Sequence, residues 1–338
     1  MNKNYFLVCS ALALSLSWVG CHKSKLEKPS AFSPPSGPME LKIKWPKGER
    51  VVQSMTMTQS MVMTIPSMPS PMEQSTSMGQ DYGFTVLDET PDGKHEIEMD
   101  FLSAKMTSAM AGKTLVDYDS SKKPAPDAAP DPVGQMLGKV IGSKIQFYLD
   151  ATNGVERVEG TDALMSRLSA GAQVEQLAML KNMFSEGYLK QMMSQYRFLP
   201  ATAVQPGDTW PVQFEFPMDK MGSLVMDYNF TFQNWEIHGK RYCARLEFQG
   251  TIKSGDSPNA NPKGVSFKVL DGTCSGSSWF DPELGITIDT TMNQTMNSVI
   301  TVPGAGRGNA AKMQSIPAQM TQTIFVKLLS LDSEKFSS

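Results

Sequence analysis

Apolar and hydroxyl side chains alternate along residues 51–65, and this period of two restricts the fold more than any other feature. The odd positions carry Val, Gln, Met and Ile, while the even positions are mainly Ser and Thr. Successive side chains of a strand point to opposite faces, so the pattern predicts a strand with one apolar face and one hydroxyl-rich face. Residues 286–302 alternate in the same way, with Met292 and Met296 on one side and Asn293 and Thr295 on the other.

Weaker alternation predicts six further strands, at 95–101, 145–149, 224–232, 242–250, 265–269 and 320–328. Turn sequences at 91–93 (Pro-Asp-Gly) and 152–154 (Thr-Asn-Gly) are typical of hairpins. One long interruption, residues 161–196, has helical spacing of its leucines, and a shorter helix is expected at 133–141. The predicted class is mainly β (α+β): curved antiparallel sheets with the central helical segment packed on them or plugging them.

The two parts of the chain that flank the helical segment resemble each other. Each opens with a turn, at 46–50 and 206–210, and each closes with an aromatic residue before Asp, a turn glycine and a β-branched residue, at 147–155 and 279–286. We interpret them as two related β halves, although two generic hairpins would give the same pattern. The expected organisation is an N-terminal half at 39–160, a helical segment at 161–198, a C-terminal half at 199–331 and a tail at 332–338.

Residues 1–20 have the layout of a secretory signal peptide, with Lys3 before an uncharged, mostly apolar run that ends at Trp18. The run is about fourteen residues long, which is shorter than the roughly twenty residues that a membrane-spanning helix needs. Val19-Gly20-Cys21 is similar to the end of a bacterial lipobox, although that motif usually has leucine where this chain has Trp18. We therefore expect export, removal of residues 1–20 and lipidation of Cys21 with diacylglycerol and a fatty acid such as palmitate; cleavage by ordinary signal peptidase is the alternative.

The segment that follows supports a tether. Residues 22–38 are polar and proline-rich, without apolar periodicity, as in an extended spacer. The residue after Cys21 is His22, not the aspartate that retains many such proteins at the inner membrane. The expected location is the cell envelope, and the outer membrane if the cell is Gram-negative.

Four cysteines reduce to two in the folded domain if Cys9 leaves with the signal and Cys21 is lipidated. Cys243 and Cys274 remain, in a compartment that permits disulfides, and we predict that they pair. The alternative is two unrelated buried thiols.

Charge and motifs exclude several classes of function. The formal charge is −3, or −4 after loss of Lys3 with the signal, so nucleic acid is not an expected partner. His22, His95 and His238 lie in the spacer or beside turns, and no catalytic or cofactor fingerprint is present. We expect neither catalysis nor a cofactor.

Methionines at 55, 57, 61 and 63 place four thioethers on one strand face. Soft sulfur suits Cu(I), so Met55, Met57, Met61 and Met63 are a candidate copper site. Methionine also fills irregular apolar cores, and Met292 and Met296 alternate in the same way on another strand. We favour a core role.

Turn motifs carry a resemblance to a known family. With Gly48, the turn at 150–154, Leu199-Pro200 and Gly207-Asp208-Thr209-Trp210, the chain resembles domain of unknown function 6263, a bacterial family of secreted or lipoprotein-like β-rich proteins. The resemblance implies no activity, because none is assigned to the family. The layout is also similar, in architecture only, to the curved half-barrels of envelope lipoprotein carriers.

The leading hypothesis is therefore a non-catalytic envelope lipoprotein, held to the membrane by its lipid anchor, whose curved β domain binds an apolar ligand or an envelope protein. The alternatives are an interaction domain with a filled core and no ligand, and a methionine-based copper protein. No residue can be assigned to ligand binding from the sequence.

Overall fold

A computed structural model describes residues 26, 28–66, 68–122, 132–169, 184–217, 222–255, 266–303 and 313–333. Twelve strands and a few short helices make up this part of the chain, so the predicted mainly β class is confirmed. The strands are β1 (Glu49–Met63), β2 (Met72–Glu89), β3 (His95–Met110), β4 (Lys113–Asp119), β5 (Lys144–Leu149), β6 (Val155–Glu159), β7 (Thr209–Pro217), β8 (Ser223–His238), β9 (Arg241–Gly255), β10 (Ser266–Asp281), β11 (Ile286–Pro303) and β12 (Met313–Ser333). The helices are α1 (Pro132–Val140), α2 (Thr161–Ser169), α4 (Glu186–Ser194) and the 3-10 turn η2 (Gln195–Arg197).

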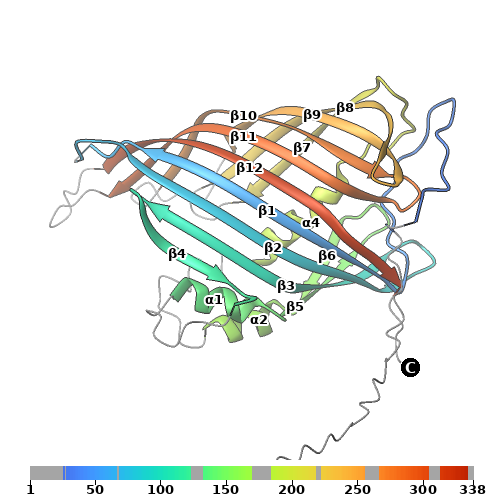
Figure 1. Cartoon of the computed structure of the whole chain (residues 1–338), viewed down its shortest axis with the longest axis horizontal. Coiled ribbons are helices and arrows are strands. Elements are labelled where there is room, and N and C mark those ends of the chain that lie inside the picture. Colours follow the sequence, from blue (N-terminus) through green and yellow to red (C-terminus); the bar gives the residue numbers. More distant parts are fainter. Residues whose placement is uncertain are drawn as a thin grey trace, which may run out of the picture.

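All twelve strands join one antiparallel sheet. Its order is β6-β5-β3-β2-β1-β12-β11-β10-β9-β8-β7, with β4 paired to the far part of β3. The first and last strands of the chain, β1 and β12, pair along almost their whole length. The two flanking regions predicted from the sequence therefore meet as neighbours at the centre of one sheet (Figure 1).

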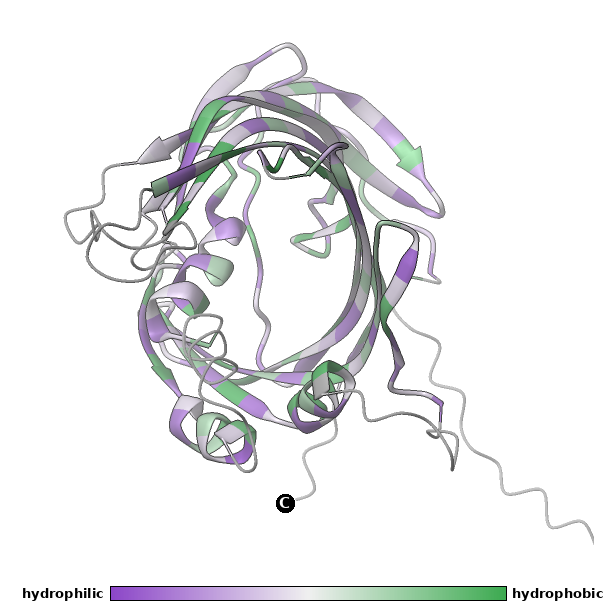
Figure 2. Ribbon diagram, turned by 90° about the vertical axis from the view of Figure 1, so that its left-hand side faces the viewer, coloured by the Kyte–Doolittle hydropathy of each residue, from purple (hydrophilic) through white to green (hydrophobic). Residues whose placement is uncertain are grey.

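The sheet rolls so that its edge strands β6 and β7 approach the same helix. Seen end-on, the roll has an oval cross-section with the helices along one side (Figure 2). Helix α4 contacts both β6 and β7, so it bridges the two edges that do not pair with each other. Leu189 and Met193 of α4 are buried, so α4 packs on the sheet, which is one of the two arrangements expected for this segment. Residues 170–183 of the predicted helical segment lie outside the described residues.

The alternation predicted for residues 51–65 is present in β1. Val51 and Gln53 are buried, whereas Thr56, Thr58 and Ser60 are exposed. The face of the sheet that carries the buried side chains is called the inner face below, and the opposite face is called the outer face. Burial of one face explains why the register holds, since a one-residue slip would turn the hydroxyls inward.

The main apolar core lies at one end of the roll, called the core end below. Phe147, Phe232 and Phe280 are fully buried there, and α2 and α4 add Leu164, Leu168 and Leu189. The end that contains the β1–β2 and β11–β12 connections is called the far end; it is on the left in Figure 1.

Part of the predicted tether, from Lys28 onward, and the segment that leads from it to β1 are fastened to the core end. The carbonyl of Lys28 accepts a hydrogen bond from Arg241, and the hydroxyl of Ser30 donates to Glu283 at 2.6 Å. Further along, the indole of Trp45 donates to Asn153 at 3.0 Å. Arg241 is itself buried and ion-paired with Asp281 at 2.6 Å. This segment therefore ties the β8–β9 and β10–β11 turns to the opposite half of the sheet.

Candidate functional site

Methionines from neighbouring strands form a row across the inner face. Met57 of β1 lies directly opposite Met78 of β2, and Met78 lies opposite Met106 of β3. On the other side, Ile324 of β12 pairs with Met57, and Met292 of β11 pairs with Ile324. All five side chains are only partly buried. We call Met57, Met78, Met106, Met292 and Ile324 the core-side row.

A second apolar row lies four residues further along β1. It contains Met61, Met110, Met320 and Met296, together with Gln74. Met296 is buried and the other methionines are partly exposed. We call this set the far-side row. Flexible, polarisable thioethers adapt to irregular partners better than branched side chains do, so the two rows form a deformable apolar wall.

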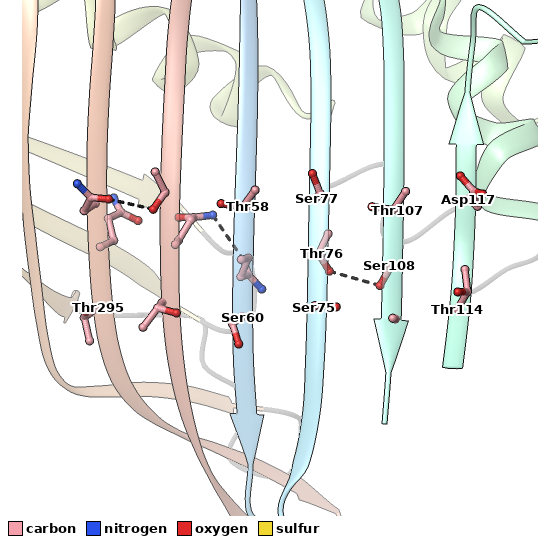
Figure 3. A pocket seen from close by; sticks show the side chains of 17 residues that line it. Thr58, Ser60, Ser75, Thr76, Ser77, Thr107, Ser108, Thr114, Asp117 and Thr295 are labelled. Carbon is pink, nitrogen blue, oxygen red and sulfur yellow. Dashed lines mark hydrogen bonds between the residues drawn. The ribbon is translucent and has the colours of Figure 1, made fainter. Parts of the chain in front are cut away.

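Polar, uncharged side chains separate the two methionine rows. Gln59 lies opposite Thr76 and Gln322, and the row continues to Ser108 on one side and Gln294 on the other. The hydroxyls of Thr76 and Ser108 lie 3.3 Å apart (Figure 3). We call Gln59, Thr76, Ser108, Gln294 and Gln322 the polar row. In the three rows together there is no charged side chain.

The core-side row continues onto an aromatic wall. Beyond Met292 the facing residues are Gly276, Phe248, Phe230 and Trp210. Trp210 stacks on Phe230 with ring centroids 5.9 Å apart, and Phe230 and Phe248 are 5.0 Å apart. Gly276 is required here because a Cβ at that position would lie 2.4 Å from the Phe248 ring. This wall is filled by its own side chains.

The outer face carries a shallow polar hollow of about 580 Å³ across β4, β3, β2, β1, β12 and β11 (Figure 3). Thr58, Ser77 and Thr107 lie directly opposite one another in it, and Asp117 is its only charged lining residue. A second hollow of about 440 Å³ continues past Asn293 and Thr295 onto β10 and β9. Residues of the polar row also border the first hollow. Its hydroxyl residues Thr58, Ser77 and Thr107 are exposed, so we assign this surface to the solvated outside of the sheet.

A small charged cluster lies on the outer face near the core end. His238 pairs with Asp289 and stacks on Trp279 with ring centroids 4.6 Å apart. The indole of Trp279 donates to Glu236, and this bond holds the pKa of the Glu236 carboxyl below its usual value. His95, the other histidine in a strand, has a pKa lowered by burial. Within the described residues, no three His, Cys, Asp or Glu side chains gather as metal ligands.

The candidate copper residues share the inner face, as the alternation predicts. Met55, Met57, Met61 and Met63 are all partly buried there. Trp210 is buried and stacks on Phe230, Trp279 stacks on His238, and Trp235 contacts Phe232. Cys21, the predicted lipidation site, lies outside the described residues.

The predicted disulfide between Cys243 and Cys274 is wrong, because both cysteines are free and buried. Cys274 lies opposite Gly250 of β9. Gly250 is seven residues from Cys243 along that strand, or about 23 Å at about 3.3 Å per residue. A disulfide needs Cα atoms within about 7 Å of each other. Burial raises the pKa of Cys243 to about 12 and that of Cys274 to about 11, so both thiols are poor nucleophiles.

Sequence reasoning missed most of the three rows. Gln59 belongs to the alternating run, but Met78, Met106 and Gln322 attract attention only once the strand register is known. Residues 72–80 (MEQSTSMGQ) do alternate, yet both of their faces contain polar residues, and this weakens the signal.

Fold and site together define a β-rich protein built on one rolled antiparallel sheet, with a methionine-lined inner face and a hydroxyl-rich outer face. The chain belongs to a family of unknown function (DUF6263), whose model matches residues 92–304. The family resemblance seen in the turn motifs is therefore confirmed, and the matched region includes the motifs at 150–154 and 207–210. No helix in the described part of the chain is long and apolar enough to cross a membrane.

Solved structures similar to this chain are remote in sequence. A lipovitellin structure is 8% identical with a TM-score of 0.47, and covers 87% of this chain. The chain spans only 26% of lipovitellin. An exported protein with a YmcC-like fold from Bacteroides fragilis is 11% identical with a TM-score of 0.22, covering 87% of this chain and 100% of that one. An outer-membrane channel from Pseudomonas putida is 7% identical with a TM-score of 0.19, at 87% and 100% coverage. No curated protein sequence matches significantly.

Proposed function

We propose that this chain is an exported, non-catalytic envelope protein that binds a flexible apolar ligand along the methionine rows of its inner face. The observation that carries the proposal is the contrast within one row. At one side aromatic rings fill the wall, and at the other side Met57, Met78 and Met106 remain partly exposed in direct register. A contiguous apolar surface that stays partly exposed is typical of a binding site.

Methionine suits such a ligand because its unbranched side chain can repack around chains of different shape. The absence of charged side chains from the three rows also favours an uncharged apolar surface over an ionic partner. A protein that only needed a solid core would gain more from branched or aromatic side chains, which the opposite wall contains.

Export and acylation of Cys21 complete the proposal and orient the ligand face. Cys21 and Lys28 are seven positions apart, which allows a reach of at most about 25 Å. Lys28 is fastened to Arg241 at the core end, whereas Met57 and Met61 lie toward the far end. In this arrangement the methionine rows open away from the anchoring membrane, so the ligand would arrive from, or leave toward, the opposite side.

The proposal is tested with the mature chain, produced without residues 1–20 and with Cys21→Ala, and with the uncharged fluorescent probe N-phenylnaphthylamine. We expect saturable binding with a rise in fluorescence. The triple variant Met57→Gln, Met78→Gln and Met106→Gln should weaken binding at least about tenfold, which corresponds to about 1.4 kcal/mol. Circular dichroism and thermal unfolding report whether each variant folds.

The outer face supplies a matched control. Thr58, Ser77 and Thr107 lie next to the three methionines and in register with one another. The variant Thr58→Gln, Ser77→Gln and Thr107→Gln adds the same side chains to the opposite face and should bind the probe as the parent does. Absence of saturable binding, or equal loss in both triple variants, would refute the proposal and favour an interaction domain without a ligand. Native mass spectrometry of protein purified from its own envelope would report both a ligand and the acyl chains on Cys21.

Copper binding is a second candidate, favoured by the direct register of three thioethers at Met57, Met78 and Met106. The test is Cu(I) competition with a chromogenic chelator, comparing the parent with a variant in which Met55, Met57, Met61, Met63, Met78 and Met106 are all replaced by Leu. Leucine keeps the wall apolar and removes the sulfur. Equal copper affinity in both proteins would remove this candidate and leave apolar binding intact.

A further inference from the structure

The polar row has hydrogen-bond donors that the protein satisfies only weakly. The amide of Gln322 donates to Met57 Sδ and, at 3.5 Å, to Gln59 Oε1. The amide of Gln294 donates to Met292 Sδ at 3.5 Å and to Met226 Sδ at 3.9 Å. A thioether is a weak acceptor, so these amides would gain by exchanging sulfur for an oxygen acceptor.

The same pattern recurs where the polar row reaches β8. The hydroxyl of Tyr228 contacts Met226 Sδ at 3.3 Å and Met292 Sδ at 3.5 Å. Tyr228 is buried and also forms side-chain hydrogen bonds with Gln294 and Cys274. Burial raises the pKa of its hydroxyl, which therefore stays protonated. A line of uncharged polar groups thus runs from β1 through β12 and β11 and, past Cys274 of β10 and Gly250 of β9, to Tyr228 of β8.

Three features of this line restrict the chemistry of a ligand. Gln322, Gln294 and Tyr228 each donate to a sulfur atom, so a ligand that presents an acceptor oxygen would offer them a better partner. No cationic side chain belongs to the three rows, and this disfavours a carboxylate or phosphate, which would be left buried without a counter-charge. Apolar methionine rows flank the polar row on both sides, so the acceptor lies within the ligand chain and not at its end.

We propose, resting on the proposed apolar binding, that the ligand is an uncharged long-chain ester whose carbonyl accepts hydrogen bonds from Gln322 and Gln294. Its two hydrocarbon arms lie along the core-side row and the far-side row. The carbonyl replaces Met57 Sδ and Met292 Sδ as acceptors, and the freed methionine side chains pack against the arms.

The test displaces N-phenylnaphthylamine from the mature Cys21→Ala chain with three competitors of equal chain length. They are an alkyl ester with its carbonyl at mid-chain, an alkane, and a fatty acid, each delivered from the same cyclodextrin. We expect the ester to displace the probe at about one tenth of the alkane concentration, and the fatty acid to be the weakest at neutral pH.

The combined variant Gln59→Leu, Gln294→Leu and Gln322→Leu should bind the alkane as well as the parent or better, and should lose the advantage of the ester. The single variant Gln322→Met, which keeps the side-chain length, should lose part of the advantage of the ester. It replaces the triple variant in this test if the triple variant misfolds. Asn293→Leu changes an exposed neighbour on the outer face and should leave the ester advantage unchanged.

The outcomes separate this inference from the proposed function. If neither ester nor alkane displaces the probe and the probe itself does not bind, the proposed function fails. If ester and alkane compete equally, or if the glutamine variants keep the preference for the ester, apolar binding stands and the ester inference is overturned. Strongest competition by the fatty acid would also overturn it.

Discussion

The inner face changes character along a single row of facing residues. On β1, β2 and β3 the row contains Met57, Met78 and Met106, all partly exposed, whereas on β9, β8 and β7 it contains Phe248, Phe230 and Trp210, all buried. Both walls are apolar and belong to one sheet. Alternation along the strands is therefore enough to make an apolar face. The shape of the side chains on that face decides whether they also fill the space above it.

Replacing one residue of each wall by alanine should give the largest difference in the free energy of unfolding. Phe230 is 5% exposed and contacts four other rings. Phe230→Ala is expected to lower the free energy of unfolding by about 3–5 kcal/mol, because it removes a large buried side chain and leaves a cavity. Met57→Ala should lower it by about 1 kcal/mol, roughly half the value of a fully buried side chain. Urea unfolding of both variants measures the two costs, and equal costs would mean that both walls are filled alike.

Adding a methyl group to a glycine tests how tightly the aromatic wall is packed. A Cβ at position 276 would lie 2.1 Å from the Thr291 carbonyl oxygen and 2.4 Å from the Phe248 ring. Gly276→Ala is therefore expected to destabilise the fold by about 1–3 kcal/mol, as overpacking does. Gly79 of β2 is the matched control, because its nearest atom would be 3.8 Å away. Gly79→Ala should be neutral or stabilise by about 0.5–1 kcal/mol. A neutral Gly276→Ala would show that the rings can move aside.

The two walls are built from several strands, and the sequence predicts some of these strands much better than others. Alternation at 51–65 and 286–302 predicts β1 and β11 and assigns their faces, because every other side chain there is apolar. The segment at 72–89 was not predicted as a strand, since Gln74, Thr76 and Gln80 make its inner face as polar as its outer face. Because β2 is not predicted, the alignment of Met57 with Met78 and Met106 cannot be predicted from the sequence either.

The strand register explains why the predicted disulfide is wrong. Cys243 lies in the strand predicted at 242–250, and both cysteines are buried. Their separation along the strands follows only from the pairing of β9 with β10, which places Cys274 opposite Gly250. The sequence therefore predicts which face a side chain occupies better than it predicts which residues meet across that face.

The rate at which methionines are oxidised should distinguish the two walls without any mutation. Dilute hydrogen peroxide oxidises methionine to its sulfoxide, at a rate that follows exposure of the sulfur. Met57 and Met78 are partly exposed, whereas Met226 is 9% exposed and Met296 is 4% exposed. Peptide mass spectrometry after brief treatment should find Met57 and Met78 oxidised several-fold faster than Met226 and Met296. Cys274 should stay unmodified by thiol reagents, because burial raises its pKa to about 11 and leaves little thiolate at neutral pH.

The same measurement with N-phenylnaphthylamine present sharpens the comparison. If the probe occupies the methionine rows, Met57 and Met78 should slow toward the rate of Met226, while the exposed Met313 of the far end should not change. Protection confined to the two rows would show that a ligand covers the wall that stays partly exposed in the free protein. Equal oxidation of Met57 and Met226 in the free protein would instead mean that both walls exclude solvent. The methionine rows would then be ordinary core, and the physical basis for ligand binding would be lost.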